Sequence, residues 1–162
     1  MISAVDLLKG IAVGASMKVI EVEGANGGLH TNYEGKVDAA VKALLDDSYD
    51  FAYIHVEAPD EMGHQGNAAH KVQSIEEIDK NIISVVKDAL DSANEPYRIL
   101  ILPDHPTPIR CRTHTKDPVP YILFDSTCQR KTIAHFNEKE AAATGNFVAE
   151  GCQMMNKLLG IG

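Results

Sequence analysis

A short polar run at residues 58–67 carries residue types that could do chemistry. It contains the carboxylate of Asp60 and the imidazole of His64. A carboxylate oxygen and an imidazole nitrogen together suit a borderline divalent ion such as Mn²⁺, Zn²⁺, Fe²⁺ or Co²⁺. Pro59 and Gly63 disfavour a regular helix, so we expect a loop that folds both side chains onto one point. The pair alone is a weak signal, because an ordinary polar connection between a strand and a helix explains it equally well.

Two further polar clusters lie later in the chain. Asp104 and His105 follow an apolar segment at 97–102, and His114 lies in the proline-rich loop beyond them. The carboxyl ends of parallel strands share one edge of a sheet, so side chains that are distant in the sequence can converge there. Asp104 and His105 could face separate ions on the order of 4 Å apart, as in two-metal sites. Five ligands are too many for one open catalytic ion and too few for two fully held ions.

The elements that must position these residues alternate along the chain. Helical spacing of apolar residues predicts four helices, at residues 3–15, 36–46, 67–93 and 138–159, the last with a break at Gly145. Alternating or continuous apolar runs predict four strands, at residues 17–23, 51–56, 97–102 and 119–124. This order is typical of the α/β class, with a mostly parallel sheet and helices on both faces. We expect one domain over residues 1–162.

Composition narrows the class of protein further. The net charge is −8 in 162 residues, which disfavours a nucleic-acid partner because a phosphate backbone requires a basic surface. No apolar run approaches the length needed to span a membrane, and no signal peptide is visible, so we expect no membrane partner. Three irregularly spaced cysteines indicate reduced thiols in a cytoplasmic protein: Cys111, Cys128 and Cys152.

Several other polar residues are expected to have structural or solvent-facing roles. His55 lies within a predicted strand, where a packed and hydrogen-bonded histidine is more common than a metal ligand. Lys71 is assigned to the solvated face of the long helix. Arg110 and Arg112 have the guanidinium geometry that suits phosphate, but an exposed loop position is the simpler interpretation.

Three motifs, taken in order, resemble those of the alkaline phosphatase superfamily. They are Asp60-x-x-Gly63-His64-x-Gly66, Pro103-Asp104-His105 and Thr113-His114-Thr115-x-Asp117-Pro118-Val119-Pro120. The chain is similar, more closely, to the archaeal type of cofactor-independent phosphoglycerate mutase, and residues 2–10, 31–36 and 144–146 also fit. The resemblance covers essentially the whole chain and implies a partial alkaline-phosphatase-like metal-binding domain.

The resemblance implies two divalent ions, with Mn²⁺ or Mg²⁺ expected and Zn²⁺ or Co²⁺ as alternatives. By motif, Asp60, His64 and His114 match the ligands of one ion, and Asp104 and His105 match two ligands of the other. In the family, an aspartate and a nucleophilic serine near the N-terminus complete the second site. That serine transfers the phosphoryl group of a phosphoglycerate, and the metals lower its pKa and neutralise charge on the transferred group.

The chain departs from the family at that serine. It lacks the strand and the nucleophile motif, and also the inserted domain whose arginines hold substrate. None of six serines in the chain occupies the position of the family's nucleophile: Ser3, Ser16, Ser74, Ser84, Ser92 and Ser126. We therefore expect the C-terminal piece of a mutase that interconverts 3- and 2-phosphoglycerate. We expect this piece to contain no catalytic nucleophile and to be inactive alone, and we assign it no substrate-binding residue.

Two alternatives remain open from the sequence. The intact protein could be another phosphotransferase of the superfamily, such as a phosphatase, a phosphopentomutase or a relative labelled homoserine kinase. The chain could instead be a non-catalytic metal-binding α/β module. A missing central strand would leave an exposed sheet edge, which invites self-association.

Overall fold

The computed structural model describes residues 1–128 and 134–161. The chain divides into two compact units. The first comprises Met1–Asn94 and Thr107–Thr113, and the second comprises Glu95–Pro106 and His114–Gly162. None of the helices in the described residues combines the length and the apolar content needed to cross a membrane.

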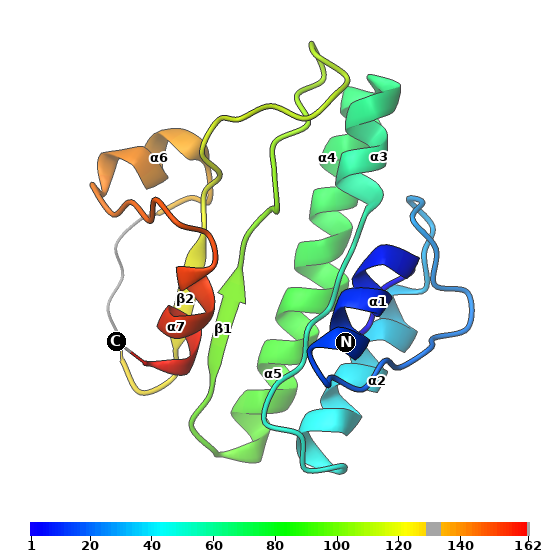
Figure 1. The fold of residues 1–162 in the computed structure, drawn as a ribbon, viewed down its shortest axis with the longest axis vertical. Coiled ribbons are helices and arrows are strands. Elements are labelled where there is room, and N and C mark those ends of the chain that lie inside the picture. Colours follow the sequence, from blue (N-terminus) through cyan, green and yellow to red (C-terminus); the bar gives the residue numbers. More distant parts are fainter. Residues whose placement is uncertain (129–133, 162) are drawn as a thin grey trace. The chain divides into compact units, whose positions relative to one another are not determined.

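Helices dominate the first unit. They are α1 (Asp6–Gly14), α2 (Tyr33–Leu45), α3 (Ala58–Gln65), α4 (Ala68–Ile78), the π-helix η1 (Asp79–Ile83) and α5 (Ser84–Ala93). The side chain of Asn32 caps α2 by accepting a hydrogen bond from the backbone N–H of Gly35. The core lies where α2 packs on η1 and α5 (Figure 1), around buried Tyr33, Val37 and Ile82.

The long helix predicted at 67–93 is confirmed, as α4, η1 and α5 in direct succession (Figure 1). Every fourth residue is buried or packs on the core: Ser74, Ile78, Ile82, Val86 and Leu90. In an α-helix a step of four residues overshoots one turn by about 40°, so this spacing would leave the core within a few steps. The i→i+5 bond from the N–H of Ser84 to the carbonyl of Asp79 widens the helix at η1. The wider turn offsets the drift and keeps the five positions inward.

The first unit forms less sheet than predicted. The strand prediction at 17–23 is wrong, because this segment makes scattered hydrogen bonds and no ladder with another strand that the structure describes. Ile20 N–H, for example, donates to the carbonyl of Met1 at 2.9 Å and Met17 N–H donates to that of Ala12 at 2.8 Å. The predicted strand at 51–56 is reduced to one parallel bridge between Ile2 and Ile54. A strand needs a neighbour along its length to satisfy its backbone groups, and neither segment has such a neighbour among the described residues.

The second unit contains a two-stranded sheet and two short helices (Figure 1). Strands β1 (Arg98–Ile101) and β2 (Ile122–Asp125) pair antiparallel, with Arg98 opposite Asp125. Strand β2 begins three residues later than predicted, because Pro118 and Pro120 have no N–H for a ladder. The mostly parallel sheet is not confirmed, since the only ladder within residues 1–128 and 134–161 is antiparallel.

The predicted C-terminal helix is two helices, α6 (Glu138–Ala143) and α7 (Gln153–Leu159), separated at the expected break. Helix α7 ends at Gly160, which has a φ of +69°. The guanidinium of Arg98 lies where a Cβ of residue 160 would be, and its Nη1 donates to the carbonyl of Leu158 at 3.3 Å. The left-handed conformation and this close approach both favour glycine at the helix end.

Asp125 stabilises the end of β2 through its carboxylate. Oδ1 accepts from the hydroxyl of Thr127 at 2.6 Å and Oδ2 accepts from Nε of Arg98 at 2.7 Å. These hydrogen bonds, the Thr127 hydroxyl first and Arg98 next, lower the pKa of Asp125 to about 2. A lowered carboxyl pKa in the folded state contributes stability above the ordinary value of 3.8, and that stability is lost as the pH falls towards about 2.

We therefore expect the free energy of unfolding of the Asp125→Asn variant to depend less on pH in the acid range. Between about pH 4 and pH 2 the free energy of unfolding should fall less in the variant than in the wild type. Urea unfolding at a series of pH values measures this slope, with substitution of the exposed Asp88 of α5, Asp88→Asn, as the control. Equal slopes for the wild type and Asp125→Asn would contradict the assignment.

Candidate metal centre

Helix α3 carries the first two candidate ligands. The prediction of a loop at 58–67 is wrong, because Ala58–Gln65 form a helix. Pro59 lies in the first helical turn, where a missing N–H leaves no intrahelical bond unmade. Gly66, with a φ of +70°, ends the helix in the left-handed conformation. The helix places Asp60 and His64 four residues apart, and therefore on the same face.

The Asp60 and His64 side chains approach each other closely enough to share one ion. Asp60 Oδ2 lies 3.4 Å from His64 Nε2, and the two side chains are 32% and 37% exposed. Two ligand atoms that each lie about 2.1 Å from a metal are separated by about 3.0–3.4 Å. Asp60 and His64 could therefore both bind one divalent ion without a change in the backbone conformation of α3.

The other ring nitrogen of His64 has a defined partner. Nδ1 lies 3.0 Å from the carbonyl oxygen of Arg112. A carbonyl can only accept a hydrogen bond, so Nδ1 must carry the proton and donate. Nε2, which faces Asp60, is then the nitrogen suited to bind a metal. Metal-binding histidines usually donate their second N–H to a carbonyl or carboxylate in this way.

The second carboxylate oxygen of Asp60, Oδ1, accepts a hydrogen bond that orients the side chain. The hydroxyl of buried Thr107 donates to Asp60 Oδ1. The carbonyl of Thr107 in turn accepts from Lys71 Nζ at 2.7 Å. Sequence reasoning missed Thr107 and placed Lys71 on a solvated face, because nothing in the spacing of these residues signals a contact between segments 36 residues apart.

The other three candidate ligands lie in the second unit. His105 donates its backbone N–H to Asp104 Oδ1 at 3.0 Å, and its Nε2 lies 3.4 Å from Asp104 Oδ2. The rings of His105 and His114 are 3.6 Å apart between centroids. The second unit therefore brings Asp104, His105 and His114 together. His114 is bonded to Thr113, the last residue of the first unit.

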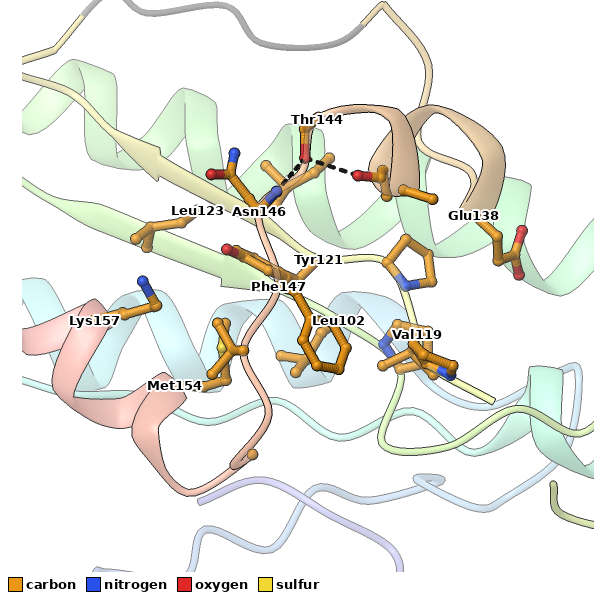
Figure 2. Close-up of a pocket in the computed structure, with 18 of the residues that line it drawn as sticks. Leu102, Val119, Tyr121, Leu123, Glu138, Thr144, Asn146, Phe147, Met154 and Lys157 are labelled. Carbon is orange, nitrogen blue, oxygen red and sulfur yellow. Dashed lines mark hydrogen bonds between the residues drawn. The ribbon is translucent and has the colours of Figure 1, made fainter. Parts of the chain in front are cut away.

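A large pocket opens in the second unit, with a volume of about 1490 Å³ (Figure 2). Most of its lining is apolar, and Figure 2 shows Leu102, Tyr121 and Phe147 among the lining side chains. Asp104 and His105 also belong to the wall. Asp104 and His105 are therefore open to a hollow rather than enclosed by packing.

The structure confirms the prediction that His55 is a packed, hydrogen-bonded histidine. Its side chain is 15% exposed and its Nδ1 lies 3.7 Å from Glu57 Oε1. The hydroxyl of Ser3 lies 3.2 Å from the same nitrogen, and the carbonyl of His55 accepts from Lys36 Nζ at 2.9 Å. Lys36 is fully buried, and burial lowers its pKa while the Glu57 carboxylate opposes that shift. These residues form a buried polar cluster just before α3.

Comparison with known proteins gives consistent matches. A family model described as the metalloenzyme superfamily matches residues 1–159. The chain is 46% identical over 160 residues to a probable 2,3-bisphosphoglycerate-independent phosphoglycerate mutase of Geobacter sulfurreducens, covering 98% of this chain and 39% of that relative. It is 43% identical over 161 residues to a mutase so named from Methanosarcina mazei, covering 99% of this chain and 39% of that one.

A solved structure is also similar, that of the PH0037 protein from Pyrococcus horikoshii. The match has a TM-score of 0.79 and 32% sequence identity, and covers 88% of this chain and 42% of that one. The chain thus spans about 39% of the length of the curated relatives described above.

Proposed function

Because the chain belongs to the metalloenzyme superfamily, an α/β fold of the alkaline-phosphatase type that binds divalent metal, we propose that it forms part of a cofactor-independent phosphoglycerate mutase. The whole protein would be an isomerase of glycolysis that interconverts 3- and 2-phosphoglycerate in the cytoplasm. The observation that carries the proposal is the Asp60–His64 pair, whose oxygen and nitrogen lie 3.4 Å apart in a chain 46% identical to a probable mutase.

We assign two divalent ions, Mn²⁺ or Mg²⁺, to five residues of this chain. By motif, Asp60, His64 and His114 would each offer one ligand atom to the first ion. Chain connectivity supports this set, because His114 follows two residues after Arg112, whose carbonyl holds His64, and two residues span at most about 7 Å. Asp104 and His105 would contribute to the second ion, and their 3.4 Å separation between Oδ2 and Nε2 suits that role.

The residues of this chain would hold and orient the ions rather than attack the substrate. Bound divalent ions lower the pKa of a nucleophile and neutralise charge on a phosphoryl group. Asp60 and Asp104 supply negative charge that favours a cation, while His64 presents Nε2 because its Nδ1 donates to Arg112. By family resemblance the nucleophilic serine belongs to a part of the mutase that this chain does not match.

We further propose that residues 1–162 are a single portion of one metal-binding domain. The parallel bridge between Ile2 and Ile54 supports a mostly parallel sheet that the rest of a mutase would extend. Sheet edges that remain unpaired would favour self-association.

A chimera tests the proposed reaction directly. Residues 1–162 replace the matching part of the Geobacter sulfurreducens relative, and formation of 2-phosphoglycerate from 3-phosphoglycerate is measured with Mn²⁺ present. We expect turnover by the chimera and none by the 162-residue chain alone. The same chimera with His114→Ala should lose activity by more than about 100-fold, since loss of a ligand should exceed the 10–100-fold typical of the residues around one.

The chimera also separates the alternatives. A folded chimera that isomerises a phosphopentose or phosphorylates homoserine, but not phosphoglycerate, would assign the chain to another phosphotransferase. Turnover by the isolated chain, or a folded chimera without any phosphotransfer, would contradict the proposal.

A further inference from the structure

A segment of the first unit, Thr107–Thr113, contacts α3 at both of its ends. At the first end the Thr107 hydroxyl donates to Oδ1 of Asp60. Thr107 is itself fixed, because it is only 3% exposed and its carbonyl accepts from Lys71 Nζ at 2.7 Å. With Oδ1 engaged, Oδ2 is the oxygen that faces His64.

At the second end the backbone of Arg112 is held in an uncommon conformation. Its φ is +52°, a region that residues with a Cβ rarely adopt. The N–H groups of Cys111 and Arg112 both donate to the carbonyl of Pro108 at 2.9 Å, which closes a tight turn. In this turn the carbonyl of Arg112 points at His64 Nδ1, 3.0 Å away. An observed backbone outlier next to a candidate site is the kind of strain that suggests a function.

Two glycines of α3 make room for the segment. A Cβ on Gly63 would lie 2.5 Å from the carbonyl oxygen and 2.9 Å from Cγ2 of Thr107. A Cβ on Gly66 would collide with the guanidinium of Arg112. The glycines of the Asp-x-x-Gly-His-x-Gly motif therefore have a physical reason: they allow Thr107 and Arg112 to approach the helix that carries Asp60 and His64.

We infer that Thr107 and Arg112 are positioning residues that set which atoms of Asp60 and His64 face a metal. Thr107 selects Oδ2 of Asp60 by occupying Oδ1, and the Arg112 carbonyl selects Nε2 of His64 by holding the proton on Nδ1. The inference rests on the proposed metal site. It adds that the site is preorganised by this segment before an ion arrives.

Matched variants at Thr107 test the first contact. Mn²⁺ binding to the full 162-residue chain is followed by the electron paramagnetic resonance signal of unbound Mn²⁺. Thr107→Val keeps the size of the side chain and removes the hydroxyl, so the affinity should fall about 10- to 100-fold, as for other residues that orient metal ligands. Thr107→Ser restores the hydroxyl and should bind within about threefold of the wild type. Circular dichroism establishes that each variant is folded.

Arg112→Val tests the second contact without requiring a metal. A β-branched residue disfavours a φ of +52° more strongly than arginine does, so the turn should open and the carbonyl should no longer be directed at His64. Nitrogen chemical shifts of the His64 ring, measured at about pH 8.5, should show the Nδ1–H tautomer in the wild type and a mixture in Arg112→Val. Arg110→Val, in the same segment, should leave the tautomer unchanged.

The outcomes separate this inference from the proposed function. If the wild-type chain binds Mn²⁺ and folded Thr107→Val binds it equally well, the inference is overturned while the metal site stands. An Nε2–H tautomer in the wild type would also overturn it. If the wild-type chain binds no Mn²⁺, the proposed metal site fails and the inference fails with it, whatever the tautomer.

Discussion

Replacing His64 by alanine is expected to abolish most of the affinity of this chain for Mn²⁺, by more than about 100-fold. The substitution removes His64 Nε2, which lies 3.4 Å from Asp60 Oδ2. Asp60 is then the one remaining candidate ligand on α3. Residues that only orient a ligand typically change metal affinity 10- to 100-fold, so loss of a ligand itself should exceed that range. Isothermal titration calorimetry of the wild type and the variant measures the difference.

His70→Ala provides the matched control for this prediction. His70 is an exposed histidine in α4, and its backbone and Nδ1 are both engaged with the side chain of Asn67. The substitution removes the same chemical group from a nearby helix but not from the proposed site. We expect Mn²⁺ affinity within about twofold of the wild type. Equal Mn²⁺ binding by the wild type and His64→Ala would show that the ion binds elsewhere.

Replacing Lys36 by alanine is expected to cost roughly 3–5 kcal/mol of stability, the range for removing one partner of a buried charge interaction. Lys36 is fully buried within α2. Its Nζ donates to the carbonyl of His55 at 2.9 Å, and its charge interacts with the Glu57 carboxylate. The substitution leaves both of those groups without this partner and creates a cavity.

Urea unfolding at neutral pH measures this loss of stability. Lys42→Ala is the matched control, because Lys42 lies on the same helix but is exposed. We expect its free energy of unfolding to stay within about 0.5 kcal/mol of the wild type, as for most surface substitutions. A loss below about 1 kcal/mol in Lys36→Ala would mean that the buried cluster contributes little.

The Lys36 substitution should also change the alkaline pH dependence. Burial lowers the pKa of Lys36 below its ordinary value of 10.5. The unfolded chain therefore binds more protons than the folded chain at pH values between the lowered pKa and 10.5, so this group makes stability rise with pH in that window. Lys36→Ala should lack the rise, which unfolding curves at increasing alkaline pH would show.

The sequence predicted the elements whose signals are local. The apolar spacing of Ile78, Ile82 and Leu90 identified the long helix, and Asn67 was expected at its start, where it caps α4 through the N–H of His70. Their four-residue interval also contained the signal for the π-helix, because an ordinary α-helix cannot keep such positions on one face for long. The predicted helix was uninterrupted, so the π-helix η1 at Asp79–Ile83 is a feature that the prediction did not include.

The errors arose where neighbours decide the structure. Pro59 and Gly63 were taken as helix breakers, but a proline in the first turn breaks no bond, and Gly63 makes space for Thr107. The segment at 17–23 has the composition of a strand, yet β-propensity depends on an adjacent strand that composition does not reveal.

In the candidate site, too, the residue types could be predicted but the contacts that the fold creates could not. Asp60, His64, Asp104, His105 and His114 were proposed as ligands from their types and motifs, and their assignment to ions stays a prediction. Thr107 and the Arg112 carbonyl could not be proposed, because a hydroxyl and a backbone oxygen contribute to the site only through the fold.

The widened turn at Asp79–Ile83 gives the longest helix one place where its length can vary. Deleting one residue there would shorten one of the four-residue steps between inward-facing residues to three residues. An ordinary α-helix accommodates a mixture of three- and four-residue steps. Deleting a residue elsewhere would rotate every later side chain by about 100° and carry Leu90 out of the core. Insertions and deletions of one residue among natural variants of this helix should therefore gather at 79–83.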